Sequence, residues 1–320
     1  MSTKRFDTGL WLRNNWLELL LLAVLLVAIV WLVALGREIW PKIRPEPVPT
    51  PGPGVFDSQR AMGIVTFLTA LGPRVAGSDA LTAAAERIEE ELRDRGWQVE
   101  VQEFEMDGVT RRNIVAKAGE GEAILLGTHY DSSPRADLDP DEAARLAPPA
   151  GANDGASGTA VLLELASALD KERLPGQVWL VFFDGQYGSD GQPVAAGVQA
   201  WIEQTPPVEA PQAVALTALV GGARQQFSID QASDPALSQQ LWDVAEQLGY
   251  AAWFIPEPQA GLDLGQAALA GLGGPVAVIA GSDSPVWRTS LDTPEQIDPE
   301  SLGRVGRTLQ VYLERPSAPQ

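Results

Sequence analysis

The pattern of apolar and polar residues divides the chain into an N-terminal apolar run and a long body in which helical and strand periods alternate. Residues 19–36 carry no charged side chain and consist mainly of Leu, Val, Ala and Ile. With the residues just before it, this run approaches the length that a helix needs to cross a hydrocarbon core of about 30 Å. Tryptophans lie near both of its ends, at the depth where aromatic side chains meet lipid headgroups. We therefore expect a transmembrane helix over residues 16–36, preceded by a basic segment, residues 1–15.

Two other interpretations of the apolar run stay open. One is a buried core helix, although the run is apolar on every face. The other is a cleaved signal peptide, because Ala34-Leu35-Gly36 resembles a cleavage site. The run is longer than the core of about 7–15 residues that signal peptides have, which favours an uncleaved anchor.

The flanking charges do not fix the orientation of this anchor, because basic residues lie on both sides of it. A long C-terminal domain crosses a membrane largely regardless of such charges. We therefore expect a single-pass protein of the cell membrane with an extracytoplasmic body. Residues 37–54 form a Pro-rich linker, which we expect to be an extended spacer.

Beyond the linker, the period of the pattern changes repeatedly between helix and strand. Asp57 or Ser58 can cap a first helix, and Ser78 can cap a second one that Gly96 ends. Residues 98–104 alternate as an edge strand does. Continuous apolar runs, typical of strands buried on both faces, occupy residues 123–127 and 178–183. Further helices fit residues 156–170, 193–204, 235–248 and 298–314, and further strands fit residues 213–220 and 275–280.

These elements predict one domain over residues 55–316, followed by a tail at residues 317–320. Strands buried on both faces require helices on each side of their sheet. The fold class that we expect is an α/β three-layer sandwich with a mixed, mostly parallel sheet between helices.

The composition narrows the chemistry of this domain. The chain has no cysteine, one histidine and a net charge of −19. Cysteine-ligated zinc, disulfide scaffolds and thiol nucleophiles are therefore excluded. Residues 1–44 carry six basic and three acidic side chains, which leaves −22 for the rest. A domain with this much negative charge repels phosphate backbones, and we therefore expect no nucleic-acid partner.

Two loops after predicted strands concentrate polar residues, at the place where open α/β sheets bind ligands. GTHYDS (127–132) places the only histidine, His129, two residues before Asp131. This spacing is common for a histidine that binds a metal ion and a carboxylate that orients it. A locally hydrogen-bonded histidine is the simpler interpretation of that tripeptide. GANDGASG (151–158) places Asp154 near a helix start, where a capping acid is also common.

Five segments, in order along the chain, resemble one family. They are GPRVAGS (72–78), GTHYDS (127–132), GANDGASG (151–158), FFDG (182–185) and WRTSLDTPEQID (287–298). Together they are similar to metallopeptidase family 28, the co-catalytic zinc aminopeptidases and glutaminyl-peptide cyclases. The resemblance covers nearly all of residues 55–316. It implies a mixed sheet between helix layers, with zinc at the carboxyl edge of the central strands, and bacterial members with an N-terminal membrane anchor.

The resemblance implies a metal site of which part is retained. His129 and Asp154 match metal ligands, and Asp131 matches the carboxylate that orients the histidine. Asp263 corresponds to an aspartate that some members use near the substrate, so a catalytic role for it stays possible.

Four functional positions of the family are substituted. The acidic pair that supplies the catalytic glutamate and a metal ligand falls on Gln186 and Tyr187. A later aspartate ligand falls on Ala218, and the last histidine ligand falls on Arg288.

The substitutions argue against metal catalysis. Catalytic zinc normally has three protein ligands plus water, and a glutamine cannot exchange the proton that a glutamate would. A guanidinium repels a dication in the same pocket. We therefore expect a vestigial site without a bound cofactor, in a non-catalytic pseudopeptidase that binds a peptide or protein partner. The alternative is an active zinc-dependent aminopeptidase or glutaminyl-peptide cyclase with an altered site.

Without metal, a buried aspartate needs another partner. We expect Arg288 to occupy the vacated position and pair with Asp154, with Tyr187 closing the same pocket. An exposed surface arginine is the alternative. The acidic residues at 137–142 lack the glycine and the closing glutamate of a calcium loop, so we expect a solvated loop there.

Overall fold

The computed structural model describes residues 54–204 and 210–315, together with eight scattered residues between positions 15 and 31. The chain divides into two compact units, Met1–Val48 and Pro49–Gln320. In the first unit, the eight described residues are helical. None of the helices formed by the described residues has both the length and the apolar character needed to cross a bilayer. Most of the predicted transmembrane helix, nearly all of the linker and the tail at 317–320 lie outside the described residues and stay predictions.

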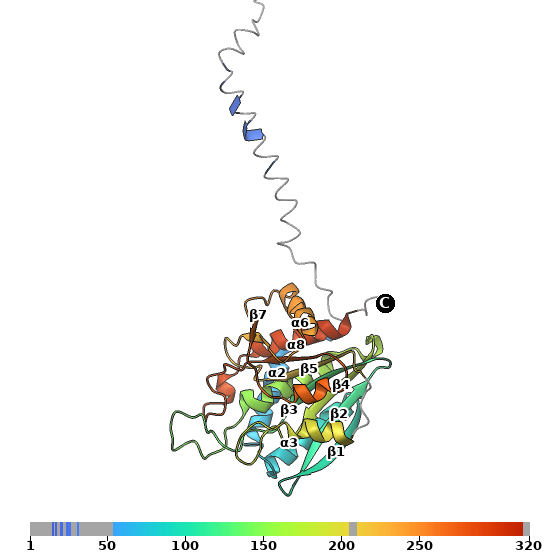
Figure 1. The fold of residues 1–320 in the computed structure, drawn as a ribbon, viewed down its shortest axis with the longest axis vertical. Coiled ribbons are helices and arrows are strands. Elements are labelled where there is room, and N and C mark those ends of the chain that lie inside the picture. Colours follow the sequence, from blue (N-terminus) through green and yellow to red (C-terminus); the bar gives the residue numbers. More distant parts are fainter. Residues whose placement is uncertain are drawn as a thin grey trace, which may run out of the picture. The chain divides into compact units, whose positions relative to one another are not determined.

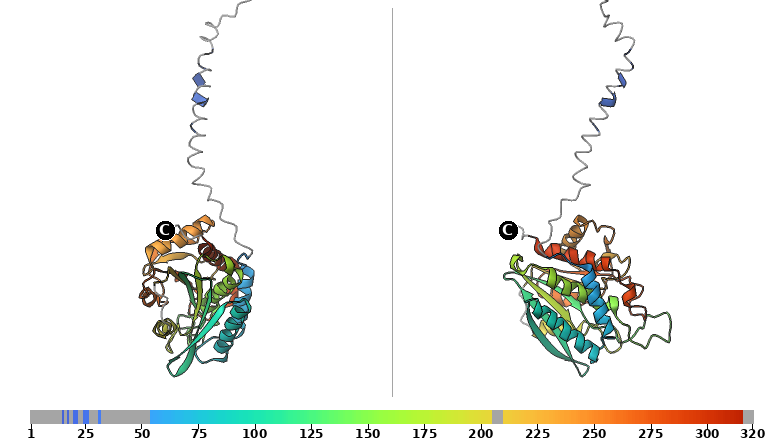
Figure 2. Two further views of the ribbon diagram at one scale, coloured as in Figure 1. Left: turned by 90° about the vertical axis from the view of Figure 1, so that its right-hand side faces the viewer. Right: turned by 180° about the vertical axis from the view of Figure 1, so that it is seen from behind.

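The second unit is built on a six-stranded mixed sheet (Figures 1 and 2). The strand order is β1 (Gln98–Met106), β2 (Val109–Ala118), β4 (Gln177–Phe183), β3 (Ala123–His129), β5 (Ala213–Ala218) and β8 (Val276–Ala280). Strands β4, β3, β5 and β8 are parallel, whereas β2 pairs antiparallel with both β1 and β4. Every residue of β3 and β5 is buried, as continuous apolar runs predict. The carboxyl ends of the parallel strands therefore meet at one edge of the sheet.

Helices cover both faces of this sheet, which confirms the expected α/β sandwich. Because successive strand residues point to opposite faces, Ile124 and Leu126 pack on one side and Leu125 on the other. The first side packs against α2 (Ser58–Ala70), α3 (Asp79–Asp94), α4 (Gly158–Ala168), α6 (Pro235–Gln247) and α8 (Pro299–Glu314). The second side packs against α5 (Ala196–Gln204) and α7 (Gln266–Ala270).

The predicted helix starts of α2 and α3 are confirmed. The Asp57 carboxylate accepts hydrogen bonds from the backbone N–H groups of Gln59 and Arg60. The Ser78 hydroxyl accepts one from the backbone N–H of Leu81. Asp57 rather than Ser58 is therefore the N-cap residue of α2.

The structure adds elements that the sequence pattern did not predict. Strand β2 lies inside the sheet, and a separate parallel pair is formed by β6 (Phe227–Asp230) and β7 (Phe254–Gln259). Helix α7 is also new. Strand β7 has the sequence FIPEPQ, whose prolines and exposed polar residues do not alternate as a half-buried strand does.

Candidate functional site

Polar and aromatic side chains gather where the parallel strands end. His129 is the last residue of β3, and Ala218 is the last residue of β5. Tyr187 follows β4, and the segment of Trp287 and Arg288 follows β8. The parallel sheet therefore brings together residues that are far apart in the sequence.

His129 is buried between two carboxylates. Its Nδ1 lies 3.2 Å from Asp131 Oδ1, and its Nε2 lies 3.3 Å from Asp154 Oδ1. Burial lowers the pKa of His129, but the hydrogen bonds and charges of Asp131 and Asp154 outweigh burial and raise this pKa to about 10. At neutral pH the site therefore holds an imidazolium between two carboxylates.

Tyr187 supplies the second partner of Asp154. Its hydroxyl donates to Asp154 Oδ2 and accepts a hydrogen bond of 3.1 Å from Trp287 Nε1. Burial, followed by the charge of Asp154, raises the pKa of Tyr187 well above its usual value, so the hydroxyl keeps its proton. Both carboxylate oxygens of Asp154 thus face donors from this chain. Tyr187 lies in the pocket where we expected it.

The loop that carries Asp154 has an unusual backbone. Gly155 has a φ of +96°, and a Cβ at this position would lie 2.2 Å from the backbone oxygen of Asp131. The Asp292 carboxylate accepts the backbone N–H groups of Asn153 and Asp154 at 2.6 and 3.1 Å. Burial, followed by the charge of Asp154, raises the pKa of Asp292 to about 7.

Arg74 holds the same loop from the other side. It is fully buried, and its guanidinium donates to the backbone oxygens of Tyr130, Ala150 and Gly151 at 2.9, 3.0 and 2.7 Å. These bonds attach the loop of Asp154 to the loop of His129. The GPRVAGS segment is therefore part of the framework of the site.

Gln186 and Asp263 contact each other. The Gln186 amide nitrogen donates to the backbone oxygen of Asp263 at 2.7 Å, while the exposed Asp263 carboxylate accepts the backbone N–H of Gly265 at 2.9 Å. Gln186 thus fastens the loop after β7 to the sheet edge. Ala218 contributes a methyl group to the small space that Asp154 and Gln186 also line.

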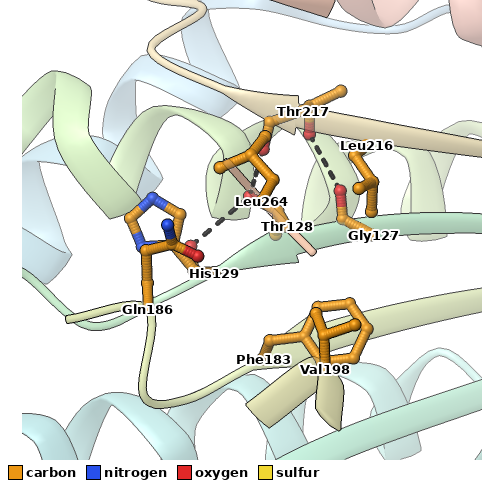
Figure 3. A pocket seen from close by; sticks show the side chains of 9 residues that line it. All are labelled: Gly127, Thr128, His129, Phe183, Gln186, Val198, Leu216, Thr217 and Leu264. Atoms are coloured by element: carbon orange, nitrogen blue, oxygen red, sulfur yellow. Dashed lines mark hydrogen bonds between the residues drawn. The ribbon is translucent and has the colours of Figure 1, made fainter. Parts of the chain in front are cut away.

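Little room is left between these side chains. Figure 3 shows the space beside His129 and Gln186, which Phe183, Val198 and Leu264 enclose. Its volume is about 10 Å³, as is that of the adjoining space at Asp154 and Tyr187. Each space has room for roughly one water molecule.

The expected pairing of Arg288 with Asp154 is wrong. The Arg288 guanidinium is buried and pairs through two nitrogens with the Asp137 carboxylate, with Nε at 2.8 Å from Oδ1. It also lies 5.3 Å from the ring centroid of Trp287. Asp154 needs no arginine, because His129 supplies its countercharge. The alternative of an exposed surface arginine is wrong as well.

The expectation of a solvated acidic loop is also wrong for part of residues 137–142. Asp139 is 2% exposed, and its Oδ2 accepts the backbone N–H and the hydroxyl of Ser290 at 2.7 and 2.5 Å. These hydrogen bonds lower the pKa of Asp139. Figure 1 shows residues 134–150 as a green loop that extends from the body at the left. Its acidic residues attach it to the segment after β8.

The donors at this edge do not fit the two zinc ions that the resemblance implies. Among the residues that the structure describes, no three His, Cys, Asp or Glu side chains are placed to hold one metal ion. Tyr187 keeps its proton, Ala218 has no donor atom in its side chain, and Arg288 is a cation. Zinc in catalytic sites usually takes three protein ligands.

Sequence reasoning missed three residues of this network. Arg74, Trp287 and Asp292 all lie in segments that carry the resemblance, but their spacing gave no indication of their contacts. Their burial next to a polar loop depends on partners more than fifty residues away. Only the fold brings these partners together.

The fold and the edge site define a class of protein, the zinc exopeptidase-like α/β sandwiches. The *Tannerella forsythia* glutaminyl cyclase shares 29% identity with this chain, with a TM-score of 0.75 over 81% of this chain and 99% of that one. A Zn-dependent exopeptidase from *Parabacteroides distasonis* also shares 29% identity, with a TM-score of 0.74 over 84% and 100%. The model of peptidase family M28 matches residues 113–313. The chain belongs to this family, as its motifs predicted.

A curated relative matches over a shorter stretch. The *Escherichia coli* K12 protein YfbL is 38% identical over 112 residues, which is 34% of this chain. The match spans about 33% of the *Escherichia coli* protein.

Proposed function

We propose that this protein is a membrane-anchored, non-catalytic member of peptidase family M28 that binds a peptide or protein partner. The observation that carries the proposal is that both carboxylate oxygens of Asp154 already have partners within the chain. One of its oxygens faces His129 and the other accepts the Tyr187 hydroxyl. A metal ion at this carboxylate would have to compete with donors of the same chain on both oxygens.

The neighbouring positions support the same conclusion. Gln186 stands where the resemblance places the catalytic glutamate, and its amide is used to hold the loop of Asp263. A glutamine cannot act as a general base. The space at Asp154 and Tyr187, about 10 Å³, is far too small for the end of a peptide.

An active zinc enzyme is the second candidate, and one observation favours it. His129, Asp131 and Asp154 keep the order and mutual contact of a ligand, its orienting group and a second ligand. In this case the protein would be an aminopeptidase or a glutaminyl-peptide cyclase; the two structural relatives named above are described as a glutaminyl cyclase and a Zn-dependent exopeptidase.

Zinc content and turnover distinguish the two candidates. The full chain, purified in detergent and dialysed after exposure to zinc, is expected to retain far less than one equivalent at micromolar protein. Aminoacyl amides and N-terminal glutaminyl peptides are expected to stay intact. Stoichiometric zinc, together with turnover that disappears in His129→Ala, would establish the enzyme instead.

A restored variant serves as the matched control. Gln186→Glu, Tyr187→Glu, Ala218→Asp and Arg288→His together return the family's residues to four positions, and this variant is expected to retain zinc. Arg288→His alone is not, since Tyr187 and Ala218 remain.

A further inference from the structure

A larger cavity lies beside the closed site, on another side of Tyr187 and Asp131. Its volume is about 300 Å³, within the range of small-ligand pockets. Four loop or strand segments line it: the loop after α2, the hairpin of β1 and β2, the loop after β3 and the loop after β4. Tyr187 lines both this cavity and the small space at Asp154.

One wall of the cavity carries a buried cation with unused hydrogen-bonding capacity. Arg111, on β2, is 3% exposed and donates from Nη1 to Asp184 Oδ1 at 3.2 Å. The other oxygen of Asp184 accepts the backbone N–H of Arg112 at 3.2 Å. Within the described part of the chain, Arg111 Nε has no hydrogen-bond partner. An arginine that could make a two-pronged contact thus makes only one bond to its carboxylate.

The remaining walls combine apolar surface with a few polar groups. Val75, Ala76, Val109 and Pro134 supply apolar surface, and Ser132 adds a hydroxyl whose oxygen accepts a hydrogen bond from the backbone N–H of Arg74. Pockets for small ligands commonly have this composition, in which apolar walls bind and a few polar groups orient.

The charges around the cavity limit what can enter it. Arg111 is paired with Asp184. Both oxygens of Asp131 are engaged within the chain, Oδ1 at 3.2 Å from His129 Nδ1 and Oδ2 by the backbone N–H of Tyr187 at 3.3 Å. The remaining lining charge is Asp107, an exposed carboxylate at the hairpin turn. A ligand that is itself neutral overall, with a negative end inside and a positive end at Asp107, matches this arrangement.

We propose that the cavity binds a short zwitterionic peptide with an apolar residue at its carboxyl end. The terminal carboxylate meets Arg111 and the Ser132 hydroxyl, the apolar side chain packs against Val75 and Val109, and the amino group lies near Asp107. This inference rests on the proposed peptide-binding function and gives that function a location. Binding here needs no contact with Asp154.

The test uses leucyl-leucine and leucyl-leucine amide with the full chain in detergent. The dipeptide has the required carboxylate, and the amide lacks only its charge. Calorimetric titration is expected to give binding of the dipeptide and at least tenfold weaker binding of the amide. Equal affinities for the two peptides, or no binding of either, would overturn the proposal.

Two variants assign the binding to this cavity. Ala76→Trp fills it from its exposed rim and is expected to abolish binding, whereas Thr82→Trp, on the exposed side of α3, is expected to leave it unchanged. Arg111→Lys keeps a cation beside Asp184, so the fold should survive while dipeptide affinity falls at least tenfold. Unchanged affinity in Ala76→Trp or Arg111→Lys would contradict the assignment.

The same titrations separate this inference from the proposed function. Release of free leucine from the dipeptide, detected by mass spectrometry, would refute the non-catalytic proposal. Whether the cavity is the binding site is tested independently of turnover. The tests are the preference for the dipeptide over its amide and the loss of binding in Ala76→Trp.

Discussion

At Asp154, the two carboxylate oxygens receive different donors, and these donors have separate consequences. Tyr187→Phe removes the hydroxyl on Oδ2 and leaves a buried oxygen without that bond. Loss of a hydrogen bond to a buried charged group costs about 1.5–3 kcal/mol. We expect the free energy of unfolding in urea to fall by about this amount. Trp287→Phe removes the bond to the Tyr187 oxygen and replaces the indole by a smaller ring, but it leaves the bond from Tyr187 to Asp154 and should cost less. An equal or larger loss would contradict this ranking.

Rising pH is expected to remove stability that His129 contributes. Its pKa lies near its usual value of 6.5 when unfolded and at about 10 when folded, so the contribution is full below pH 6.5 and is lost as the pH rises through 10. The raised pKa of Asp292 acts in the same direction, because stability is lost as the pH rises from the usual 3.8 through about 7. Each pKa unit corresponds to about 1.4 kcal/mol. The urea midpoint should therefore fall steadily between about pH 6 and pH 9.

His129→Gln tests the assignment of this pH dependence. The variant should be less stable at pH 6, and its midpoint should change little between about pH 7.5 and pH 9. If the variant keeps the slope of the parent in this interval, another group causes it.

At the scale of elements, the loop between β3 and α4 depends on a backbone that few residues can adopt. Gly155→Ala would place a Cβ 2.2 Å from the backbone oxygen of Asp131, in a conformation with a φ of +96°. We expect a loss of roughly 2 kcal/mol or more in the free energy of unfolding. Gly63→Ala, at an exposed position of helix α2, meets no atom within 4 Å and should instead stabilise the fold by about 0.5–1 kcal/mol. Similar changes in both variants would refute the steric argument.

The loop of residues 134–150 and the segment after β8 are held together by contacts of their own. Arg288→Ala removes the paired contact with Asp137, while the hydrogen bonds that Ser290 donates to Asp139 remain. We expect faster amide hydrogen exchange throughout residues 134–150 and little change in the central strands. Leu146→Ala, at a position of the same loop that is 80% exposed, is the control. Exchange that rises equally in both variants would show that Arg288 does not hold the loop.

At the scale of the whole molecule, the apolar run and the acidic body make different demands on their surroundings. We propose that residues 16–36 anchor the chain and that the body is extracytoplasmic. The full chain should stay with membranes after washes with high salt and alkaline carbonate, which remove proteins held only by charge. Protease added outside spheroplasts should degrade the body. Release by carbonate, or protection of the body, would contradict the anchor or its orientation.

Local features were predictable from the sequence, and distant contacts were not. The caps Asp57 and Ser78 act within three residues of their own helices, and β3 and β4 are continuous apolar runs. Strand β7 was missed because its two prolines are unusual in a paired strand, so the pattern did not indicate that it pairs with β6. The site residues were found by motif, but the partner of Arg288 was wrong because Asp137 lies 151 residues away, in a loop that seemed to need no partner. The pairing of His129 with Asp131, two residues further on, was predicted, whereas its contact with Asp154 depends on how the loop between β3 and α4 folds back.

The contact between Tyr187 and Asp154 also affects how the protein depends on its environment. A bound ion stabilises a fold by an amount that varies with the concentration of that ion. A hydroxyl that belongs to the chain stays beside its carboxylate at a fixed effective concentration, whatever the supply of metal. At the extracytoplasmic location that we propose, where trace metals vary with the habitat of the cell, we therefore expect the fold to keep the same stability in zinc-poor and zinc-rich surroundings.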